Sequence, residues 1–114
     1  MIKITNLKKS YEGGIEALNG VSFDVNSSEI TGYIGVNGAG KSTTLKILCG
    51  VIPFDDGEVL INDYKLPEDA LKIKSITGYV PETPELFNSL RVTEYFDFLK
   101  DVREIEESKF LKRV

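Results

Sequence analysis

Residues 35–43 carry the clearest chemical pattern in this chain. They read Gly-Val-Asn-Gly-Ala-Gly-Lys-Ser-Thr, so four residues separate Gly35 from Gly40, and Lys41 and Ser42 follow directly. This spacing is the phosphate-binding loop pattern, or P-loop. Glycines let the backbone turn its N–H groups toward phosphate oxygens, while the lysine supplies a mobile cation and the serine hydroxyl can ligate Mg²⁺. The pattern predicts a site for a nucleoside triphosphate.

The segments on either side must position this loop. Residues 29–34, Glu-Ile-Thr-Gly-Tyr-Ile, are typical of a strand that enters it, and residues 43–48 are typical of a helix that leaves it. Strand, loop and helix in this order are the setting that the motif requires. The helix adds its dipole and its unpaired N–H groups to the same anion site. The alternative, a glycine-rich turn that binds nothing, does not explain this setting.

Composition bounds the class of protein. With 114 residues, 41% hydrophobic and 28% charged, the chain is ordinary for at most one soluble globular domain. The net charge of −4 argues against a nucleic-acid partner. The absence of histidine excludes Ser-His-Asp and Cys-His machinery and histidine-based zinc sites. The single cysteine, Cys49, fits a small core residue in a reducing compartment. We see neither a secretory signal nor a membrane-spanning run.

Hydrophobic periodicity predicts mixed strands and helices along the chain. Alternating patterns indicate strands over residues 2–7, 17–25 and 58–62, and an apolar run indicates a strand over residues 75–80. Helices are expected from Pro67 to about residue 74, over residues 92–102, and from about residue 106 to the end. Asp55-Asp56-Gly57 reads as a turn.

A boundary is expected near Glu82. Residues 1–82 would then form a P-loop core with a β-subdomain, and residues 83–114 would begin a helical subdomain. The aromatic residues of the second part are expected to form its core or to line a groove for a partner's helix; they are Phe87, Tyr95, Phe96 and Phe98.

The assembled motifs resemble the nucleotide-binding domain of ABC transporters over nearly the whole chain. The loop at residues 35–43 has the family's G-x-N-G-A-G-K-S-T form. Tyr11 stands where the family places an aromatic residue, called the A-loop, and residues 76–82 (Ile-Thr-Gly-Tyr-Val-Pro-Glu) are similar to the strand and loop that carry its Q-loop. Residues 50–62 match the stretch that usually follows the P-loop helix.

The resemblance implies a fold and a set of site residues. The fold would be α/β and P-loop NTPase-like: a partial ABC ATPase core with an N-terminal antiparallel β-subdomain and the start of a helical subdomain. Tyr11 would stack on adenine and Thr43 would contact an inner phosphate, although Tyr11 could be only a turn residue and Thr43 only a helix start. The cofactors would be ATP and Mg²⁺, with Lys41 and Glu82 as catalytic residues and Ser42 and Glu82 as metal ligands. The remaining contacts to the nucleotide would come from Gly35, Asn37, Gly38, Ala39, Gly40 and Ser42.

Glu82 departs from the family's usual glutamine. A carboxylate can ligate Mg²⁺ directly or orient water as a base, which an amide cannot do. It also repels a triphosphate when the metal is absent. We therefore expect nucleotide binding that depends unusually strongly on Mg²⁺.

A larger departure concerns motifs that the family places after the Q-loop. The chain has no Leu-Ser-Gly-Gly signature, no apolar strand ending in Asp-Glu and no switch histidine. It looks like the N-terminal half of such a domain. We expect it to bind ATP without meaningful turnover on its own, since half of the groups around the γ-phosphate are missing. We also expect an open sheet edge with exposed apolar surface, and hence marginal stability or self-association.

The resemblance implies the ATP-binding subunit of an ABC transporter, which couples ATP hydrolysis to transport. Its partners would be a membrane-spanning permease subunit and a second ATP-binding protomer, and it would lie in the cytoplasm on the inner face of the cell membrane. Three alternatives remain open. The acidic balance counts against a soluble ABC-type ATPase of repair or translation. A different P-loop enzyme, a kinase or GTPase, is the second, and a GTPase should show an Asn-Lys-x-Asp base reader, which the sequence lacks. A truncated, non-catalytic nucleotide-binding module that acts by dimerising is the third.

Overall fold

The computed structural model describes residues 1–83, 87 and 89–112 of the chain. They belong to two compact units, Met1–Tyr79 and Val80–Val114. The boundary expected near Glu82 stays a prediction.

The first unit is built on a four-stranded antiparallel sheet with the order β2-β1-β3-β4. Its strands are β1 (Ile2–Tyr11), β2 (Ile15–Val25), β3 (Asp56–Ile61) and β4 (Tyr64–Leu66). Gly13 and Gly14 both have positive φ angles and close the turn between β1 and β2, a conformation that other residues rarely adopt. In the centre of the sheet, Ile4 of β1 lies opposite Phe23 of β2 and Val59 of β3.

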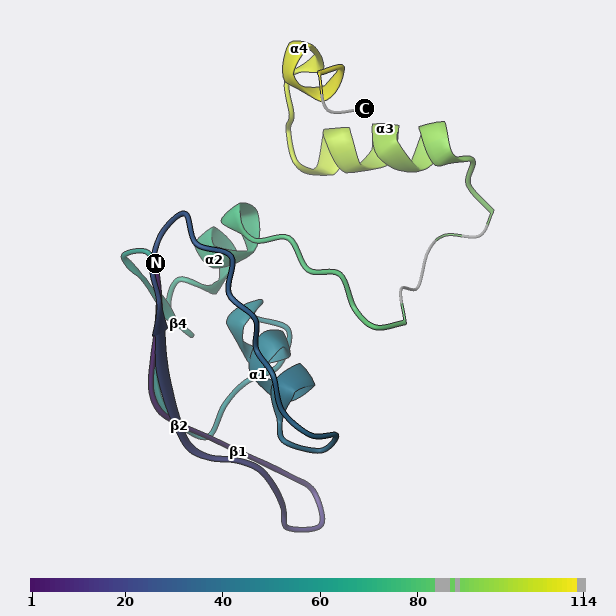
Figure 1. Ribbon diagram of the computed structural model, residues 1–114. Helices are drawn as coiled ribbons and strands as arrows, with labels where there is room; N and C mark the ends of the chain where they lie inside the picture. The colour runs from purple at the N-terminus through teal and green to yellow at the C-terminus, as the bar shows by residue number, and fades with distance from the viewer. Residues whose placement is uncertain (84–86, 88, 113–114) are drawn as a thin grey trace. The chain divides into compact units, whose positions relative to one another are not determined.

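Two helices lie against one face of this sheet, α1 (Lys41–Leu48) and α2 (Ala70–Ile76) (Figure 1). The alternation of the strands turns Ile4 and Val59 toward them, where both are buried together with Ile47 of α1 and Ile73 of α2. Because burial of apolar side chains is the main favourable term in folding, this core fixes α1, and with it the end of the P-loop, on the sheet.

Most predicted elements of the first unit are present, but two predicted strands are wrong. Residues 29–34 are in neither a strand nor a helix, and Ile30 and Ile34 are 105% and 92% exposed. The segment is strand-like in composition, but a strand forms only where a neighbour completes its backbone hydrogen bonds, and no strand in the described part of the chain lies beside this one. Residues 75–76 end α2 instead, and residues 77–80 form no strand. The short β4 was not predicted.

The second unit contains α3 (Val92–Val102) and α4 (Glu107–Phe110). The backbone N–H of Arg91 donates to Glu94 Oε2 at 2.7 Å where α3 begins. Lys100 of α3 is ion-paired with Glu107 at 2.8 Å and lies over the ring of Phe110. The predicted helix over residues 92–102 is therefore confirmed. The helix expected from residue 106 onward ends at Phe110, and residues 113–114 lie outside the described residues.

The aromatic residues of this unit do not form a buried core within the described residues. The ring of Phe87 lies 5.7 Å from that of Phe98 and 6.5 Å from that of Tyr95, yet both phenylalanines are exposed, as is Phe96. Neither α3 nor α4 has a buried residue. Among the described helices, none is long and apolar enough to cross a bilayer.

Candidate functional site

Glycines set the path of the P-loop into α1. Gly38 and Gly40 have φ angles of +83° and +81°, in the left-handed region that favours glycine. A Cβ atom on Gly40 would lie 2.5 Å from the carbonyl oxygen of Ala17 and from Leu18 Cδ2, so the loop runs in close contact with β2. Because Gly40 is the N-cap, the helix begins at Lys41, two residues before the predicted start.

The Lys41 ammonium lies over this loop. Its Nζ atom donates to the carbonyl oxygens of Gly35 and, at 2.7 Å, of Val36. The loop itself is closed by the Ala39 N–H, which donates to the Val36 carbonyl oxygen at 3.2 Å. An anion that enters here meets a cation together with the N-terminal end of α1, whose dipole favours negative charge.

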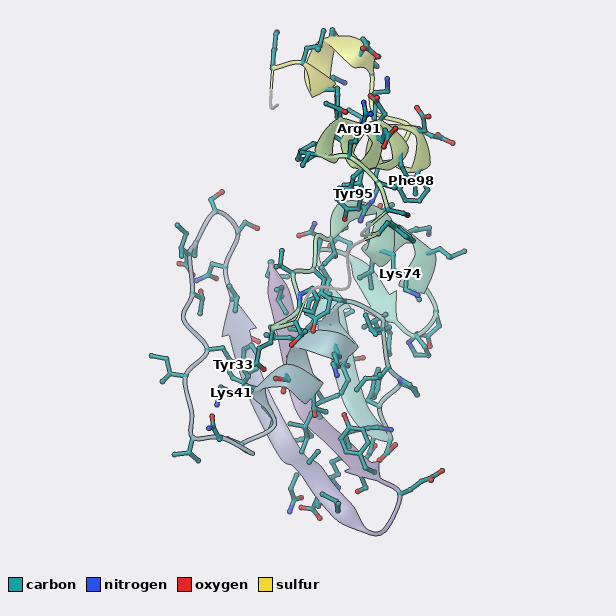
Figure 2. The ribbon with its side chains drawn as sticks, turned by 90° about the vertical axis from the view of Figure 1, so that its right-hand side faces the viewer. Tyr33, Lys41, Lys74, Arg91, Tyr95 and Phe98 are labelled. Atoms are coloured by element: carbon teal, nitrogen blue, oxygen red, sulfur yellow. The ribbon has the colours of Figure 1, made fainter. Side chains whose placement is uncertain are left out.

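Tyr33 connects the extended segment before the loop to the rest of the unit. Its ring lies 5.1 Å from that of Phe23 on β2, and its hydroxyl is 3.4 Å from Thr44 Oγ1. Buried Thr44 in turn donates to the carbonyl oxygen of Gly40 at 2.9 Å. Figure 2 labels Tyr33, on the segment that leads into the loop, and Lys41, at the start of α1. Sequence reasoning missed Tyr33 and Thr44; their only signal was an aromatic residue and a hydroxyl close to the P-loop.

Tyr11 and Thr43, two of the predicted nucleotide contacts, meet in the structure. The Tyr11 hydroxyl lies 3.1 Å from Thr43 Oγ1, which joins the end of β1 to the first turn of α1 across 32 positions of sequence. The Tyr11 ring remains exposed, whereas Thr43 is buried. The stacking of Tyr11 on adenine stays a prediction.

The other predicted residues are distributed over both units. Ser42 is exposed in the first turn of α1, and Asn37, Gly38 and Ala39 are exposed in the loop. Glu82 is exposed and belongs to the second unit, so its pairing with Ser42 at a metal stays a prediction. The described residues contain no cluster of three or more His, Cys, Asp or Glu side chains that could hold a metal by themselves. The two predicted ligands are oxygen donors, the type that Mg²⁺ prefers.

Asp55, in the turn before β3, forms hydrogen bonds with residues at the end of β1. Its carboxylate accepts the Ser10 backbone N–H at 2.6 Å and the Lys9 ammonium at 3.2 Å. These two hydrogen bonds, first the one from Ser10, lower the pKa of Asp55 below its ordinary value. The stabilisation from this carboxylate is therefore complete above the ordinary aspartate pKa and is lost as the pH falls through the lowered value.

The sequence of the chain is similar to those of known proteins. A family model described as "ABC transporter" matches residues 18–113. A linearmycin resistance ATP-binding protein of Bacillus subtilis is 35% identical over 98 residues, which cover 86% of this chain and 31% of that protein. A methionine import ATP-binding protein of Helicobacter acinonychis is 30% identical over 118 residues, which cover 100% of this chain and 36% of that protein. The chain thus spans about a third of the length of these relatives.

Solved structures give the same result for the fold. The structure of an ATP-binding subunit of an ABC transporter matches with a TM-score of 0.88 and 30% identity, over 99% of this chain and 47% of that one. A dimeric structure of a bacterial ABC transporter cassette matches with a TM-score of 0.83 and 27% identity, over 99% of this chain and 53% of that one. The α/β, P-loop NTPase-like fold expected from the sequence is confirmed by these likenesses.

Proposed function

This chain belongs to the ABC transporter family, and we propose that it binds ATP as part of an ATP-binding subunit that couples ATP hydrolysis to transport through a separate membrane protein. The observation that carries the proposal is the P-loop itself. Its glycines adopt left-handed angles, α1 begins at Lys41, and the Lys41 ammonium lies over the loop. These are the features that bind a triphosphate through backbone N–H groups and a single cation.

Each predicted site residue has a proposed role. Lys41 neutralises the outer phosphates, Thr43 contacts an inner phosphate, and the exposed face of Tyr11 stacks on the base. Ser42 and Glu82 supply oxygen ligands for Mg²⁺, with Glu82 also able to orient water. When bound, Mg²⁺ would neutralise negative charge on the phosphates.

The proposed partners are a second ATP-binding protomer and a membrane-spanning permease subunit, at the inner face of the cell membrane. A solved cassette that resembles this chain is dimeric, and one relative is described as a methionine import protein, which supports both. The net charge of −4 gives no support to a nucleic-acid partner. Because the 114 residues contain no histidine and no apolar run followed by Asp-Glu, we propose that this chain alone binds ATP without turning it over.

The proposal predicts saturable binding of one ATP per chain that strengthens when Mg²⁺ is added. Isothermal titration calorimetry with ATP, with and without Mg²⁺, measures this directly. Phosphate release from the same samples should stay at the buffer background. Circular dichroism shows whether the sample is folded. A folded chain that gives no binding heat with Mg²⁺ and ATP would contradict the proposed function.

Replacing Glu82 by glutamine should weaken the dependence on Mg²⁺. The carboxylate both ligates the metal and repels the free triphosphate, so its loss lowers the affinity with Mg²⁺ and raises it without. We expect the ratio of the dissociation constants without and with Mg²⁺ to fall about tenfold. Glu104→Gln removes the same charge from the same unit and should leave that ratio unchanged. An unchanged ratio in Glu82→Gln would show that Glu82 does not act on the metal.

A further inference from the structure

A chain of contacts runs from the turn before β3 to the P-loop and involves a lysine that the proposed function leaves unused. Asp55 accepts a hydrogen bond from Lys9 Nζ at 3.2 Å. Lys9 Nζ in turn lies over the ring of Tyr11, 5.8 Å from its centroid. The hydroxyl of that ring meets Thr43 Oγ1 at 3.1 Å.

The Lys9 side chain is held in this place. It is only 12% exposed, which is unusual for a lysine on a small sheet, whereas its partner Asp55 is 47% exposed. Asp55 is itself fixed to the main chain of β1, because it accepts the Ser10 N–H at 2.6 Å and donates its own N–H to the Lys8 carbonyl oxygen at 3.0 Å. Lys9 is therefore positioned by an aspartate that is itself fixed to β1 by two hydrogen bonds, one through its carboxylate and one through its main-chain N–H.

We propose that Lys9, held by Asp55, is a positioning residue for the nucleotide base. It covers one face of the Tyr11 ring and leaves the other face to stack on the base. The inference rests on the proposed function, which assigns Tyr11 to the base. A cation over an aromatic ring is attracted to it, and a ring fixed before the ligand arrives loses less conformational entropy when the ligand binds.

The charge arrangement makes the effect specific to the base. Lys9 is paired with Asp55, so the pair adds little net charge near the phosphates. A contribution through the Tyr11 ring should therefore appear with ATP and disappear with a triphosphate that has no base. A contribution through simple attraction to phosphate would appear equally with both ligands.

The same unit contains a matched arrangement away from the P-loop. Lys72 of α2 is paired with Asp69 at 2.9 Å and lies over the ring of Tyr64, 5.3 Å from its centroid. Tyr64 belongs to β4, at the sheet edge opposite β2. Lys72→Met thus removes a similar lysine–carboxylate–tyrosine contact without touching the proposed site, and serves as the control variant.

The experiment compares Mg²⁺-ATP with Mg²⁺-tripolyphosphate by calorimetric titration of the wild type, Lys9→Met, Asp55→Asn and Lys72→Met. We expect Lys9→Met to weaken ATP binding about threefold to fivefold more than it weakens tripolyphosphate binding, since both ligands meet the Asp55 charge that this variant leaves unpaired. Asp55→Asn should act in the same direction, and Lys9→Arg should restore the affinity, since arginine also lies well on aromatic rings. Lys72→Met should bind both ligands as the wild type does.

Tyrosine fluorescence follows stacking on the Tyr11 ring directly. The chain has five tyrosines and no tryptophan, so tyrosine emission is directly observable. Stacking of ATP on Tyr11 should quench part of this emission. The midpoint of the quenching curve should lie at about threefold to fivefold higher ATP concentration in Lys9→Met than in the wild type, and tripolyphosphate should cause no quenching. An unchanged midpoint in Lys9→Met would contradict the positioning role.

Two binding results would overturn the inference. Equal losses for ATP and tripolyphosphate in Lys9→Met would mean that the lysine acts on phosphate. Tighter ATP binding in Lys9→Met would mean that the lysine blocks the face that the base needs. Should Lys9→Met fail to fold, Asp55→Asn decides by the same criteria. Failure of the proposed function is distinguishable, because then the wild type itself would bind neither ligand, or Tyr11→Ala would bind ATP unchanged.

Discussion

Replacing Lys41 by methionine is expected to weaken ATP binding about 100-fold or more. Methionine keeps the apolar stem of the side chain as far as Cε but removes the ammonium, which lies over the loop against the carbonyl oxygens of Gly35 and Val36. Hydrogen bonds that involve charged groups contribute roughly 1.5–3 kcal/mol each, and the ammonium can make two or more of them to phosphate oxygens. A loss of about 3 kcal/mol corresponds to a factor of about 100 in affinity.

The matched control for Lys41 lies on the same helix. Lys46 is an exposed lysine in the last turn of α1, more than one helical turn from the N-terminal end that meets the anion. Lys46→Met removes the same charge from α1 and should change the dissociation constant for Mg²⁺-ATP less than twofold. Only the weak, salt-screened electrostatic effect of one charge on the ligand is lost. Calorimetric titration with Mg²⁺-ATP measures both variants. Equal affinities for Lys41→Met and the wild type would exclude the P-loop as the ATP site.

Replacing Gly40 by alanine is expected to lower the free energy of unfolding by about 3 kcal/mol or more. The added Cβ would lie 2.5 Å from both the Ala17 carbonyl oxygen and Leu18 Cδ2, and the backbone oxygen cannot rotate away as a side chain could. Overpacking typically costs roughly 1–3 kcal/mol, and a left-handed φ adds roughly 1–2 kcal/mol for a residue with a Cβ. For a protein of ordinary stability this is a large fraction of the total.

Gly38→Ala separates these two contributions. Gly38 has nearly the same φ as Gly40, +83° against +81°, but a Cβ there would meet nothing within 4 Å. It should therefore cost only the backbone strain, roughly 1–2 kcal/mol. Urea unfolding followed by circular dichroism measures the stability of both variants. If the free energy of unfolding falls with urea concentration at the same slope as in the wild type, stability alone has changed. Equal losses for the two variants would show that the contact with β2 does not constrain the loop.

The P-loop was predictable from the sequence because its function depends on residue types at fixed spacing. Gly35, Gly40 and Lys41 can be recognised without knowing what surrounds them. The position of the helix start was less predictable. The sequence pattern places Lys41 and Ser42 in the loop because they belong to the motif, whereas the left-handed Gly40 already ends the loop and starts α1.

The contacts that hold the site in place could not be predicted from local patterns. Tyr33 with Thr44, and Asp55 with Lys9, join residues 11 and 46 positions apart, and neither pairing has a sequence signature. The predicted strand at residues 29–34 shows the converse. Its pattern is strand-like, but pairing with a neighbour decides whether a strand forms, and periodicity within the segment carries no information about the neighbour.

The segment that leads into the P-loop without a strand partner would connect two equilibria, the pairing of this segment with a strand and the binding of ATP. Residues 29–36 reach the loop without a strand ladder, and fixing a residue's backbone costs roughly 1–2 kcal/mol in conformational entropy. Any polypeptide that paired with this segment would supply part of that ordering and so raise the affinity for ATP without touching it. Thermodynamic reciprocity then requires ATP to strengthen the pairing by the same factor. If ATP binds at this loop as proposed, strand pairing and nucleotide binding would therefore be allosterically coupled, and the nucleotide would act as an assembly signal for the sheet.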